Sequence, residues 1–366
     1  MPPRRRTNYF LNHLRRRLTA LGSPADGWAL TGDILTFLFV KPFRLMRLPA
    51  TISHVSGPEK IDLEHDELVV VCLVRNGETH IESFIEHHLG LGAKHLVFID
   101  NGSTDATIEI ARRYDRVTVL QTPLPFRAYK NWMRLYLMKR FGNHRWVLSL
   151  DVDERFDFPF SDILDLRSFL SYLNKHHYNA VVAQMLDMFA DEPMSGGDAD
   201  RAGSLLERFP FYDMSDIRKE SYDAHEICSY NTASNADISV YFGGIRRTVF
   251  GADCTLTKHP LVFLDGSVKP VPAHFARNAR VADISCVLYH FKCMPTLKKD
   301  AALAIREKGY SRDSYEYRQY HDVLEDDPHL RIRQPSSQTL QSVNELVDAG
   351  FLVVSNAYTM WAEGQR

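Results

Sequence analysis

The stretch of sequence that decides the fold is Trp146-Val147-Leu148-Ser149-Leu150-Asp151-Val152-Asp153-Glu154. Its first five residues are largely apolar, which is typical of a buried strand, and acidic residues follow without a spacer. Two carboxylates that end a strand one residue apart lie at the carboxyl edge of the sheet, where open α/β sheets bind their ligands. Such hard oxygen donors suit Mg²⁺ or Mn²⁺, and these ions suit a diphosphate. A solvated acidic turn is the simpler interpretation of a D-x-D motif that stands alone, so the surrounding sequence decides between the two.

Segments typical of strands and of helices alternate around this stretch. Continuous apolar or β-branched runs predict strands at residues 68–74, 96–99, 117–120, 146–150 and 180–186. Apolar residues at helical spacing predict helices at residues 81–89, after 105 up to about 113, at 129–141 and at 161–175. Strands that alternate with helices imply right-handed crossovers and a mostly parallel sheet. The sequence therefore predicts an α/β fold, a Rossmann-like sheet flanked by helices, with a less regular C-terminal region.

The pattern becomes irregular after residue 187. Residues 191–203 are rich in Gly, Asp, Ser and Pro, which predicts a loop. Strand-like pieces return at 238–242 and 285–291, and a helical stretch is expected near 297–307. Residues 311–366 are polar apart from one apolar piece at 346–354, and they support no specific prediction.

The N-terminus is strongly basic. Residues 1–50 hold nine Lys and Arg against two Asp, a net charge of +7, so the remainder carries −9 of the total of −2. This arm is expected to be a solvated tail or to contact an anionic membrane surface. Nucleic acid is not an expected partner, because no basic platform with aromatic residues follows. The apolar run at 34–40 is too short to span a bilayer, which takes about 20 residues.

Cysteine and histidine spacing gives no metal-binding motif. The five cysteines are scattered without a C-x-x-C pair, so neither a zinc site nor a disulfide framework is indicated. The adjacent His87 and His88 also lack metal spacing and are expected on a helix surface. Reduced thiols predict a cytoplasmic protein, with peripheral contact at the inner face of the membrane through the basic N-terminus as an option.

Three polar loops follow the first, second and fourth predicted strands. They read Arg75-Asn76-Gly77-Glu78, Asp100-Asn101-Gly102-Ser103-Thr104-Asp105 and Asp151-Val152-Asp153-Glu154. In this order and context they resemble the glycosyltransferases of the GT-A fold, in particular family 2 and the related group with R-N-E, D-N-G-S-x-D and D-x-D-E motifs. The resemblance covers residues 66–190, with weaker similarity to about 300. The chain departs from R-N-E by Gly77, which shifts the acidic residue by one position.

The resemblance implies an enzyme, a hexosyltransferase-type glycosyltransferase of polysaccharide biosynthesis. It would move a sugar, with inversion, from a nucleoside-diphosphate sugar to a glycan or lipid-linked acceptor. Mn²⁺ or Mg²⁺ would act as a Lewis acid on the leaving diphosphate. Four segments are expected: a basic N-terminal arm and strap at 1–65, a nucleotide-sugar-binding GT-A half at 66–190, an acceptor-side half at 191–310 and a C-terminal extension at 311–366.

The resemblance also assigns metal and nucleotide ligands. Asp153 is expected to ligate the metal directly, while Asp151 contacts the metal site through a bound water or binds the ribose. His290 resembles a late histidine that GT-A enzymes often supply as a further metal ligand; a buried core histidine is an equally good interpretation. Asp100 and Asn101 match the position that recognises the base and the ribose, although the same residues also suit a capped turn without a ligand.

Polar residues beside these motifs are expected to complete the nucleotide-sugar site. Arg75, with its neighbour Asn76, is expected to bind phosphate, unless Arg75 pairs with Glu78 instead. Lys130 opens the helix before the D-x-D strand and matches a polar position of the family. Solvation of the helix face accounts for Lys130 equally well. Lower-ranked candidates for contact with the diphosphate or the acceptor are Lys258, His274 and the pair Arg246-Arg247.

An inverting transferase also needs a carboxylate that deprotonates the acceptor hydroxyl. The candidates that follow the fifth predicted strand are Asp187, Asp191, Glu192 and Glu226. Asp187, directly past that strand, is preferred, and Asp191 is the next choice. Glu154 is expected to orient the metal pair or the acceptor.

Two other functions compete with this hypothesis. A phosphatase of the haloacid-dehalogenase type also uses a D-x-D after a strand, but its motif normally follows the first strand, and the Asp100 loop would have no role. A non-catalytic GT-A-like domain that binds a glycan is the other alternative. The retained Asp100, Asp151 and Asp153 favour an active enzyme.

Overall fold

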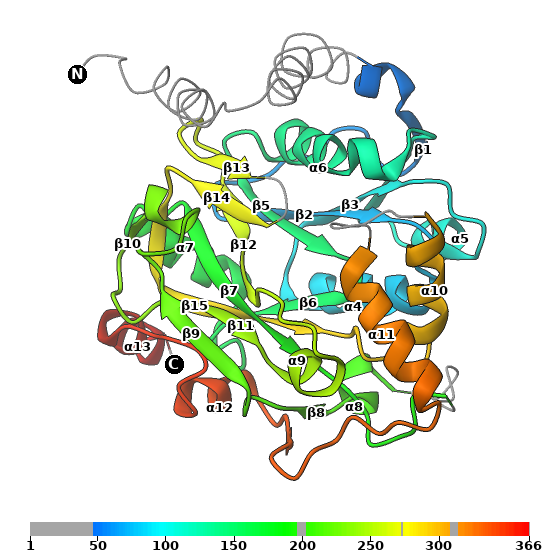
Figure 1. Ribbon diagram of the computed structural model, residues 1–366. Coiled ribbons are helices and arrows are strands. Elements are labelled where there is room, and N and C mark those ends of the chain that lie inside the picture. The colour runs from blue at the N-terminus through cyan, green and yellow to red at the C-terminus, as the bar shows by residue number, and fades with distance from the viewer. Residues whose placement is uncertain (1–46, 196–202, 272–273, 308–313, 366) are drawn as a thin grey trace, which may run out of the picture. The chain divides into compact units, whose positions relative to one another are not determined.

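The computed structural model describes residues 47–195, 203–271, 274–307 and 314–365 (Figure 1). The chain divides into two compact units, Met1–Thr51 and Ile52–Arg366. Residues 1–46 of the predicted basic arm, with their apolar run, lie outside the described residues. The second unit carries every predicted site residue. No described helix is both long and apolar enough to cross a membrane.

One ten-stranded sheet organises the described part of the second unit. The strands lie in the order β1-β4-β3-β2-β5-β12-β7-β15-β10, and β6 pairs with β15 beside this path. Their bounds are β1 (Ser53–Ser56), β2 (Leu68–Val74), β3 (His95–Asp100), β4 (Val117–Gln121), β5 (Trp146–Asp151), β6 (Glu154–Asp157), β7 (Ala180–Asp187), β10 (Thr232–Ala233), β12 (Thr257–Phe263) and β15 (Arg280–His290).

The sheet consists of two parallel groups separated by one antiparallel strand. Parallel pairing joins β4, β3, β2 and β5, and again β7, β15 and β10. β12 lies between the groups, antiparallel to both β5 and β7, so the two groups point the same way. All five predicted strands therefore exist with one direction, and the predicted mostly parallel α/β sheet is confirmed.

Helices cover both faces of the first parallel group. They are α4 (Glu78–Leu91), α5 (Thr107–Ala111), α6 (Phe126–Gly142) and α7 (Leu166–Lys175). Figure 1 shows α6 on one side of β2 and β3, and α4 on the other. A Cβ atom on Gly142 would lie 1.6 Å from Cγ2 of Val147, so the end of α6 approaches β5 too closely for any side chain. The four predicted helices are confirmed, with α5 shorter than expected.

The core beneath α4 follows the alternation of the strands. Leu68, Val70, Cys72 and Val74 of β2 are buried on one face, in one cluster with residues of α4, α5 and α7. β2 is buried on its other face as well, which explains its continuous apolar sequence. This double coverage holds the strand ends, and thus the three motif loops, on a rigid support.

Short elements complete the unit after β7. They are α8 (Leu205–Arg208), β8 (Phe211–Tyr212), β9 (Ile217–Ser221), η2 (Cys228–Tyr230), β11 (Ser239–Gly243), α9 (Ile245–Phe250), β13 (Lys269–Val271), β14 (Phe275–Arg277), α10 (Leu297–Glu307), α11 (Tyr315–Asp326), β16 (Gln338–Thr339), α12 (Val343–Asp348) and α13 (Asn356–Glu363). The predicted pieces at 238–242 and 285–291 correspond to β11 and to the end of β15.

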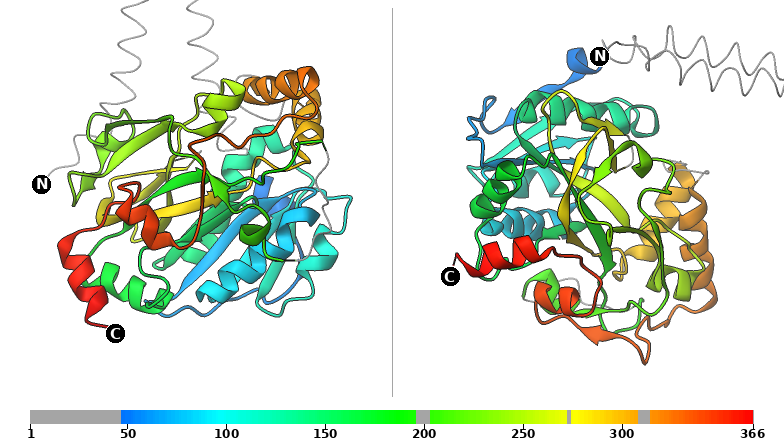
Figure 2. Two further views of the ribbon diagram at one scale, coloured as in Figure 1. Left: turned by 90° about the horizontal axis from the view of Figure 1, so that it is seen from below. Right: turned by 90° about the vertical axis from the view of Figure 1, so that its left-hand side faces the viewer.

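The sequence supported no specific prediction for the C-terminal residues. They pack into three separate hydrophobic clusters. Tyr358 of α13 joins the cluster beneath α4 and α7, where its ring lies 5.0 Å from that of Tyr172. Leu346 of α12 packs in a second cluster with β11 and β15, and Tyr320 of α11 in a third with α9 and α10. Figure 2 shows α12 and α13 beside the sheet in two further views. The extension is thus an integral part of the unit.

His88 corrects one sequence-based expectation. It is fully buried rather than on a helix surface, because β6 packs against α4. Its Nδ1–H donates to the carbonyl of Phe84 at 2.8 Å, and its Nε2 accepts the backbone N–H of Phe156 at 3.2 Å. His88 follows Ile81 by seven residues and so lies on the buried face of α4.

The buried, neutral His88 predicts a loss of stability in mild acid. Burial, with repulsion from His87 and Arg155, lowers the pKa of His88 well below 6.5 in the folded protein. The unfolded chain therefore takes up this proton first, and the stabilisation, complete above about pH 6.5, is lost as the pH falls below that value. One such group contributes up to about 1.4 kcal/mol per pH unit.

Urea unfolding between pH 6.5 and 5 measures this effect. His88→Gln removes the titrating group, so its unfolding free energy should fall less steeply with pH than that of the wild type. His177→Gln, at an exposed position, should keep the wild-type slope. Equal slopes for His88→Gln and the wild type would contradict the assignment.

Candidate functional site

Three strand ends meet in register at the carboxyl edge of the sheet. His290, the last residue of β15, pairs with Asp187 at the end of parallel β7 and with Glu154 at the start of antiparallel β6. β5 ends at Asp151 and β6 begins at Glu154, so the turn between them places the D-x-D motif beside Asp187 and His290. Backbone pairing thus assembles residues that are more than a hundred positions apart in the sequence.

His290 links two of the predicted carboxylates. Its Nδ1–H donates to Oδ1 of Asp187 at 2.5 Å, and its Nε2 lies 3.5 Å from Oδ2 of Asp153. The bond to Asp187 fixes the ring so that Nε2 is presented to Asp153. Lys292 Nζ also lies 3.5 Å from Oδ2 of Asp153. Burial would raise the pKa of Asp153, but Lys292 and His290 outweigh it and hold that pKa well below its usual range.

The buried Arg246 binds the carboxylate oxygen of Asp187 that His290 does not contact. Arg246 Nε donates to Oδ2 of Asp187 at 2.8 Å, and Arg246 Nη1 donates to Glu316 at 3.0 Å. Burial would raise the pKa of Asp187, but Arg246 and His290 outweigh it and lower that pKa to about 2. A carboxylate of such low basicity is a poor proton acceptor at neutral pH. Asp187 thus lies between Arg246 and His290, where it can orient the imidazole ring, and its role as the base stays a prediction.

Two buried residues, Glu154 and Arg155, fix the shape of the D-x-D turn through hydrogen bonds to its backbone. Glu154 is fully buried, accepts the backbone N–H of Asp151 at 3.0 Å and pairs with Lys258. The next residue, Arg155, donates to three backbone carbonyls in and beside the turn at 2.9 to 3.0 Å. Burial lowers the pKa of Arg155 to about 9. Sequence reasoning missed Arg155, since nothing in a D-x-D-E-R string distinguishes a buried arginine from a solvated one.

Asp151 faces cationic side chains from α6 and β12, and also His274, whose pKa burial lowers well below its usual value. Arg134 of α6 pairs with its Oδ1, Lys258 Nζ of β12 lies 3.4 Å from its Oδ2, and His274 Nε2 lies 3.7 Å from the same oxygen. Burial would raise the pKa of Asp151, but Arg134 and Lys258 outweigh it and lower that pKa. Sequence reasoning ranked Lys258 and His274 low and missed Arg134. The available signal was that Arg134 follows Lys130 by one helical turn.

The side chains of Asp100 and Asn101 bind the second motif loop, Gln121 and the loop after β4. The fully buried Asp100 carboxylate accepts the backbone N–H groups of Gly102 and Ser103 at 2.9 to 3.2 Å and the amide of Gln121 at 3.0 Å. The amide of Asn101 donates to two carbonyls of the loop after β4, both at 2.9 Å. These bonds fix the shape of the second motif loop, as the capped-turn interpretation expects.

The first motif loop is tied to the second. Asn76 Oδ1 accepts the backbone N–H of Thr104 at 2.8 Å, so the two loops form one surface. Arg75, with 42% of its side chain exposed, pairs with Glu307 at 2.9 Å. Glu78 Oε2 instead accepts the backbone N–H of Ala106, so the considered Arg75–Glu78 pair is absent from the described ion pairs.

Two further predicted residues have contrasting surroundings. Lys130 lies one turn before Arg134 on α6, and burial together with repulsion from Arg134 lowers its pKa. Asp191, the second choice for the base, pairs with Arg331 and Arg333 at 3.4 and 2.7 Å. These partners tie Asp191 to the segment that follows α11.

The donor set fits a divalent ion only in part. Among the described residues, no group of three or more His, Cys, Asp or Glu side chains is arranged to hold a metal ion. Asp153 and His290 nevertheless present a carboxylate oxygen and an imidazole nitrogen to one another, with Asp187 bound to the far nitrogen. This is the arrangement of a histidine ligand with its supporting carboxylate. Mg²⁺ and similar ions commonly take one or two protein ligands and complete their shell with phosphate oxygens and water.

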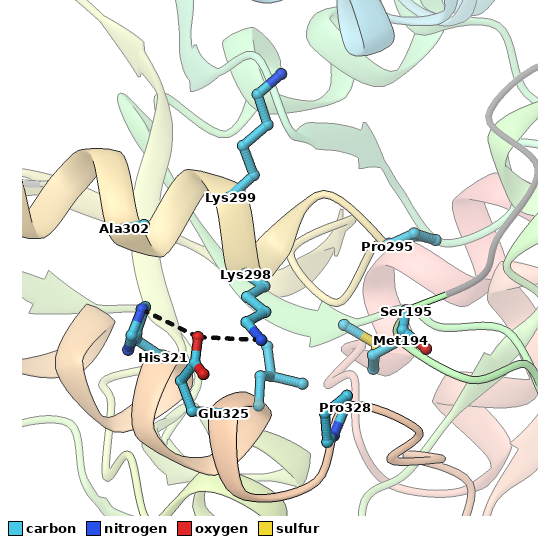
Figure 3. A pocket seen from close by; sticks show the side chains of 10 residues that line it. Met194, Ser195, Pro295, Lys298, Lys299, Ala302, His321, Glu325 and Pro328 are labelled. Atoms are coloured by element: carbon cyan, nitrogen blue, oxygen red, sulfur yellow. Dashed lines mark ion pairs between the residues drawn. The ribbon is translucent and has the colours of Figure 1, made fainter.

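A separate cavity of about 450 Å³ lies beside α10 and α11 (Figure 3). None of the predicted site residues lines it. Its lining residues are Met194, Ser195, Pro295, Lys298, Lys299, Ala302, His321, Leu324, Glu325 and Pro328. Figure 3 shows Lys298 and His321 directed towards Glu325, at 3.0 and 3.7 Å, whereas Lys299 extends to the other side of α10. Glu325 thus partly neutralises the charge of Lys298 at this cavity.

The Asp187–Arg246 pair yields a stability prediction. Arg246→Met leaves a buried carboxylate with one cationic partner fewer, which should lower the free energy of unfolding by about 3–5 kcal/mol. Arg247→Met is the matched control, since Arg247 pairs with Asp216 where about a third of each side chain is exposed, and it should cost about 0–1 kcal/mol. Urea denaturation measures both. A cost for Arg246→Met no larger than that of the control would contradict the assigned role.

Comparison with known proteins gives little further support. No family model matches the chain, and no curated protein matches it. Among solved structures, a crystal structure of 4-diphosphocytidyl-2C-methyl-D-erythritol synthase matches 75% of this chain and 95% of its own, with 9% sequence identity and a TM-score of 0.24. At this TM-score the similarity carries no argument about fold or activity. The fold and the candidate site therefore stand on the strand order and the side chains described above.

Proposed function

We propose that the protein is a metal-dependent glycosyltransferase that moves a sugar from a nucleoside-diphosphate sugar to a glycan or lipid-linked acceptor. The observation that carries the proposal is the Asp153–His290–Asp187 row at the carboxyl ends of β5, β7 and β15. The D-x-D motif, taken alone, suits any acidic turn. A histidine that faces it and is oriented by a second carboxylate supports a metal site instead.

Asp153 and His290 are the proposed metal ligands. When bound, a divalent ion such as Mn²⁺ or Mg²⁺ neutralises the charge that develops on the leaving diphosphate. Asp187 orients His290, and Arg246 holds Asp187 in its charged form. Two protein ligands leave room for phosphate oxygens, which suits an ion that binds together with its substrate.

The loops beside this row are the proposed nucleotide site. The Asp100 loop and the Asn76 loop are joined through Thr104 and lie at the ends of the neighbouring strands β3 and β2. Asp100 fixes the shape of its loop, so the proposed contact with base and ribose comes from the loop as a whole. Open α/β sheets bind nucleotides at this edge, outside the carboxyl ends of the strands. The acceptor, a glycan or a lipid-linked glycan, is proposed to approach from the side of residues 191–310.

Incubation with a panel of nucleoside-diphosphate sugars and Mn²⁺ tests this function. The wild type should release nucleoside diphosphate from one donor, and EDTA should stop the release. Asp153→Asn removes the negative charge of one of the two proposed protein ligands and should lower the rate by at least about 100-fold. Asp162→Asn is the control, since Asp162 is an exposed carboxylate that binds Asn344, and it should leave the rate unchanged.

Thermal unfolding of both variants separates loss of activity from loss of fold. A folded Asp153→Asn variant with the wild-type rate would exclude the metal assignment. Release of inorganic phosphate from phosphomonoesters, with no dependence on a sugar nucleotide, would favour a phosphatase. Neither activity, together with glycan binding, would indicate a non-catalytic domain.

A further inference from the structure

Helix α11 reaches the site from the part of the chain for which the sequence supported no prediction. Its first turn carries Glu316 and Tyr317, and Tyr320 follows one turn after Glu316. Tyr320 is fully buried in the cluster with α9 and α10, and its hydroxyl donates to Glu316. Tyr317 is buried in the same cluster. Figure 1 shows α11 beside α9 and α10, and this packing fixes the position of its first turn.

Glu316 is the outer end of a row of alternating charges. Arg246 Nη1 donates to Glu316 at 3.0 Å, and Arg246 Nε donates to Asp187 at 2.8 Å. Asp187 accepts the Nδ1–H of His290, whose Nε2 lies 3.5 Å from Asp153. Arg246 uses two edges of one planar guanidinium, so a shift of Glu316 changes the angle at which the guanidinium holds Asp187. The position of Glu316 is therefore transmitted to His290.

Tyr317 contacts the other proposed metal ligand through Lys292. Lys292 Nζ donates to the Tyr317 hydroxyl at 2.8 Å and lies 4.8 Å from the centre of its ring. The same Nζ lies 3.5 Å from Oδ2 of Asp153, whereas a direct N–H···O bond between charged groups is about 2.7–2.9 Å long. The ammonium thus compensates the charge of Asp153 without a direct hydrogen bond to it.

We propose that Glu316 and Tyr317, adjacent in α11, are positioning residues for the two proposed metal ligands. Each acts through one cationic side chain, Arg246 for Glu316 and Lys292 for Tyr317. The inference rests on the proposed function, which assigns a divalent ion to those ligands. Replacement of side chains that support a metal ligand typically costs about 10- to 100-fold in metal affinity.

The hydroxyl of Tyr317 keeps Lys292 from competing with the ion. In Tyr317→Phe the ring stays in place, but the ammonium loses its hydrogen bond to the hydroxyl. The charge of Asp153 then draws the ammonium towards Oδ2, where it occupies the position that a metal ion needs. Binding of the ion should therefore weaken, and only while Lys292 is present.

Titration of the full chain with Mn²⁺, followed by electron paramagnetic resonance of the free ion, measures these effects without a donor sugar. Glu316→Gln and Tyr317→Phe should each weaken Mn²⁺ binding about 10-fold. Each variant has a matched control on α11. Glu325→Gln removes the charge that pairs with Lys298, also at 3.0 Å, and Tyr315→Phe removes an exposed hydroxyl. Both controls should bind Mn²⁺ within about twofold of the wild type.

A double-mutant cycle tests whether Tyr317 acts through Lys292. Lys292→Met removes the competing ammonium, so this variant should bind Mn²⁺ at least as tightly as the wild type. Adding Tyr317→Phe to Lys292→Met should then cause no further loss, because the side chain through which Tyr317 acts is gone. A loss of about 10-fold in both backgrounds would overturn the role assigned to Tyr317.

The outcomes separate this inference from the proposed function. Side chains that only stabilise the fold would lower the unfolding temperature of the variants and leave Mn²⁺ affinity unchanged. Wild-type affinity in both Glu316→Gln and Tyr317→Phe would therefore overturn the inference, while the proposed function stands. No Mn²⁺ binding by the wild type would overturn both the inference and the metal assignment. If the Mn²⁺ pattern appears while no sugar nucleotide is turned over, the positioning roles stand and the glycosyltransferase proposal fails.

Discussion

Compensation of buried charge is the constraint on which the site depends. Three carboxylates of the site have side chains that are at most 17% exposed, namely Asp153, Glu154 and Asp187. A buried carboxylate without a cationic partner would be strongly destabilising. Each has a cationic partner at the edge of the sheet: Lys292, Lys258 and Arg246, respectively. The partners come from segments far along the chain, so the site forms only when the whole unit has folded.

Antiparallel strands inserted into a parallel framework bring Lys258 and Glu154 to this edge. β12 enters between β5 and β7 against their direction, which brings its first residues, including Lys258, beside the end of β5. β6 turns back from β5 and pairs with the end of β15, which places Glu154 opposite His290. A purely parallel sheet would have put the starts of these strands at the opposite edge. The two reversals thus surround an ordinary strand end with charged side chains.

The sequence predicted the framework better than the site. The five parallel strands and four helices follow from continuous apolar runs and helical periodicity, which are local signals. Asp151, Asp153 and His290 could be named as candidates because they directly follow such runs. Arg134, Arg155 and Lys292 could not be chosen, because their roles depend on which strands are neighbours. Pairing in register, as between His290 and Asp187, is set by the tertiary fold and leaves no mark on either segment alone.

Acidic and basic side chains alternate along this edge of the sheet. Asp153 and His290 are the proposed ligands of a divalent ion, and Asp151 lies beside Arg134 and Lys258. Anomalous scattering from crystals grown with Mn²⁺ and a nucleoside diphosphate tests this account most directly. It predicts a manganese peak between Asp153 and His290, with nucleotide density beside the Asn76 and Asp100 loops. A manganese peak elsewhere, or nucleotide density away from this edge, would contradict it.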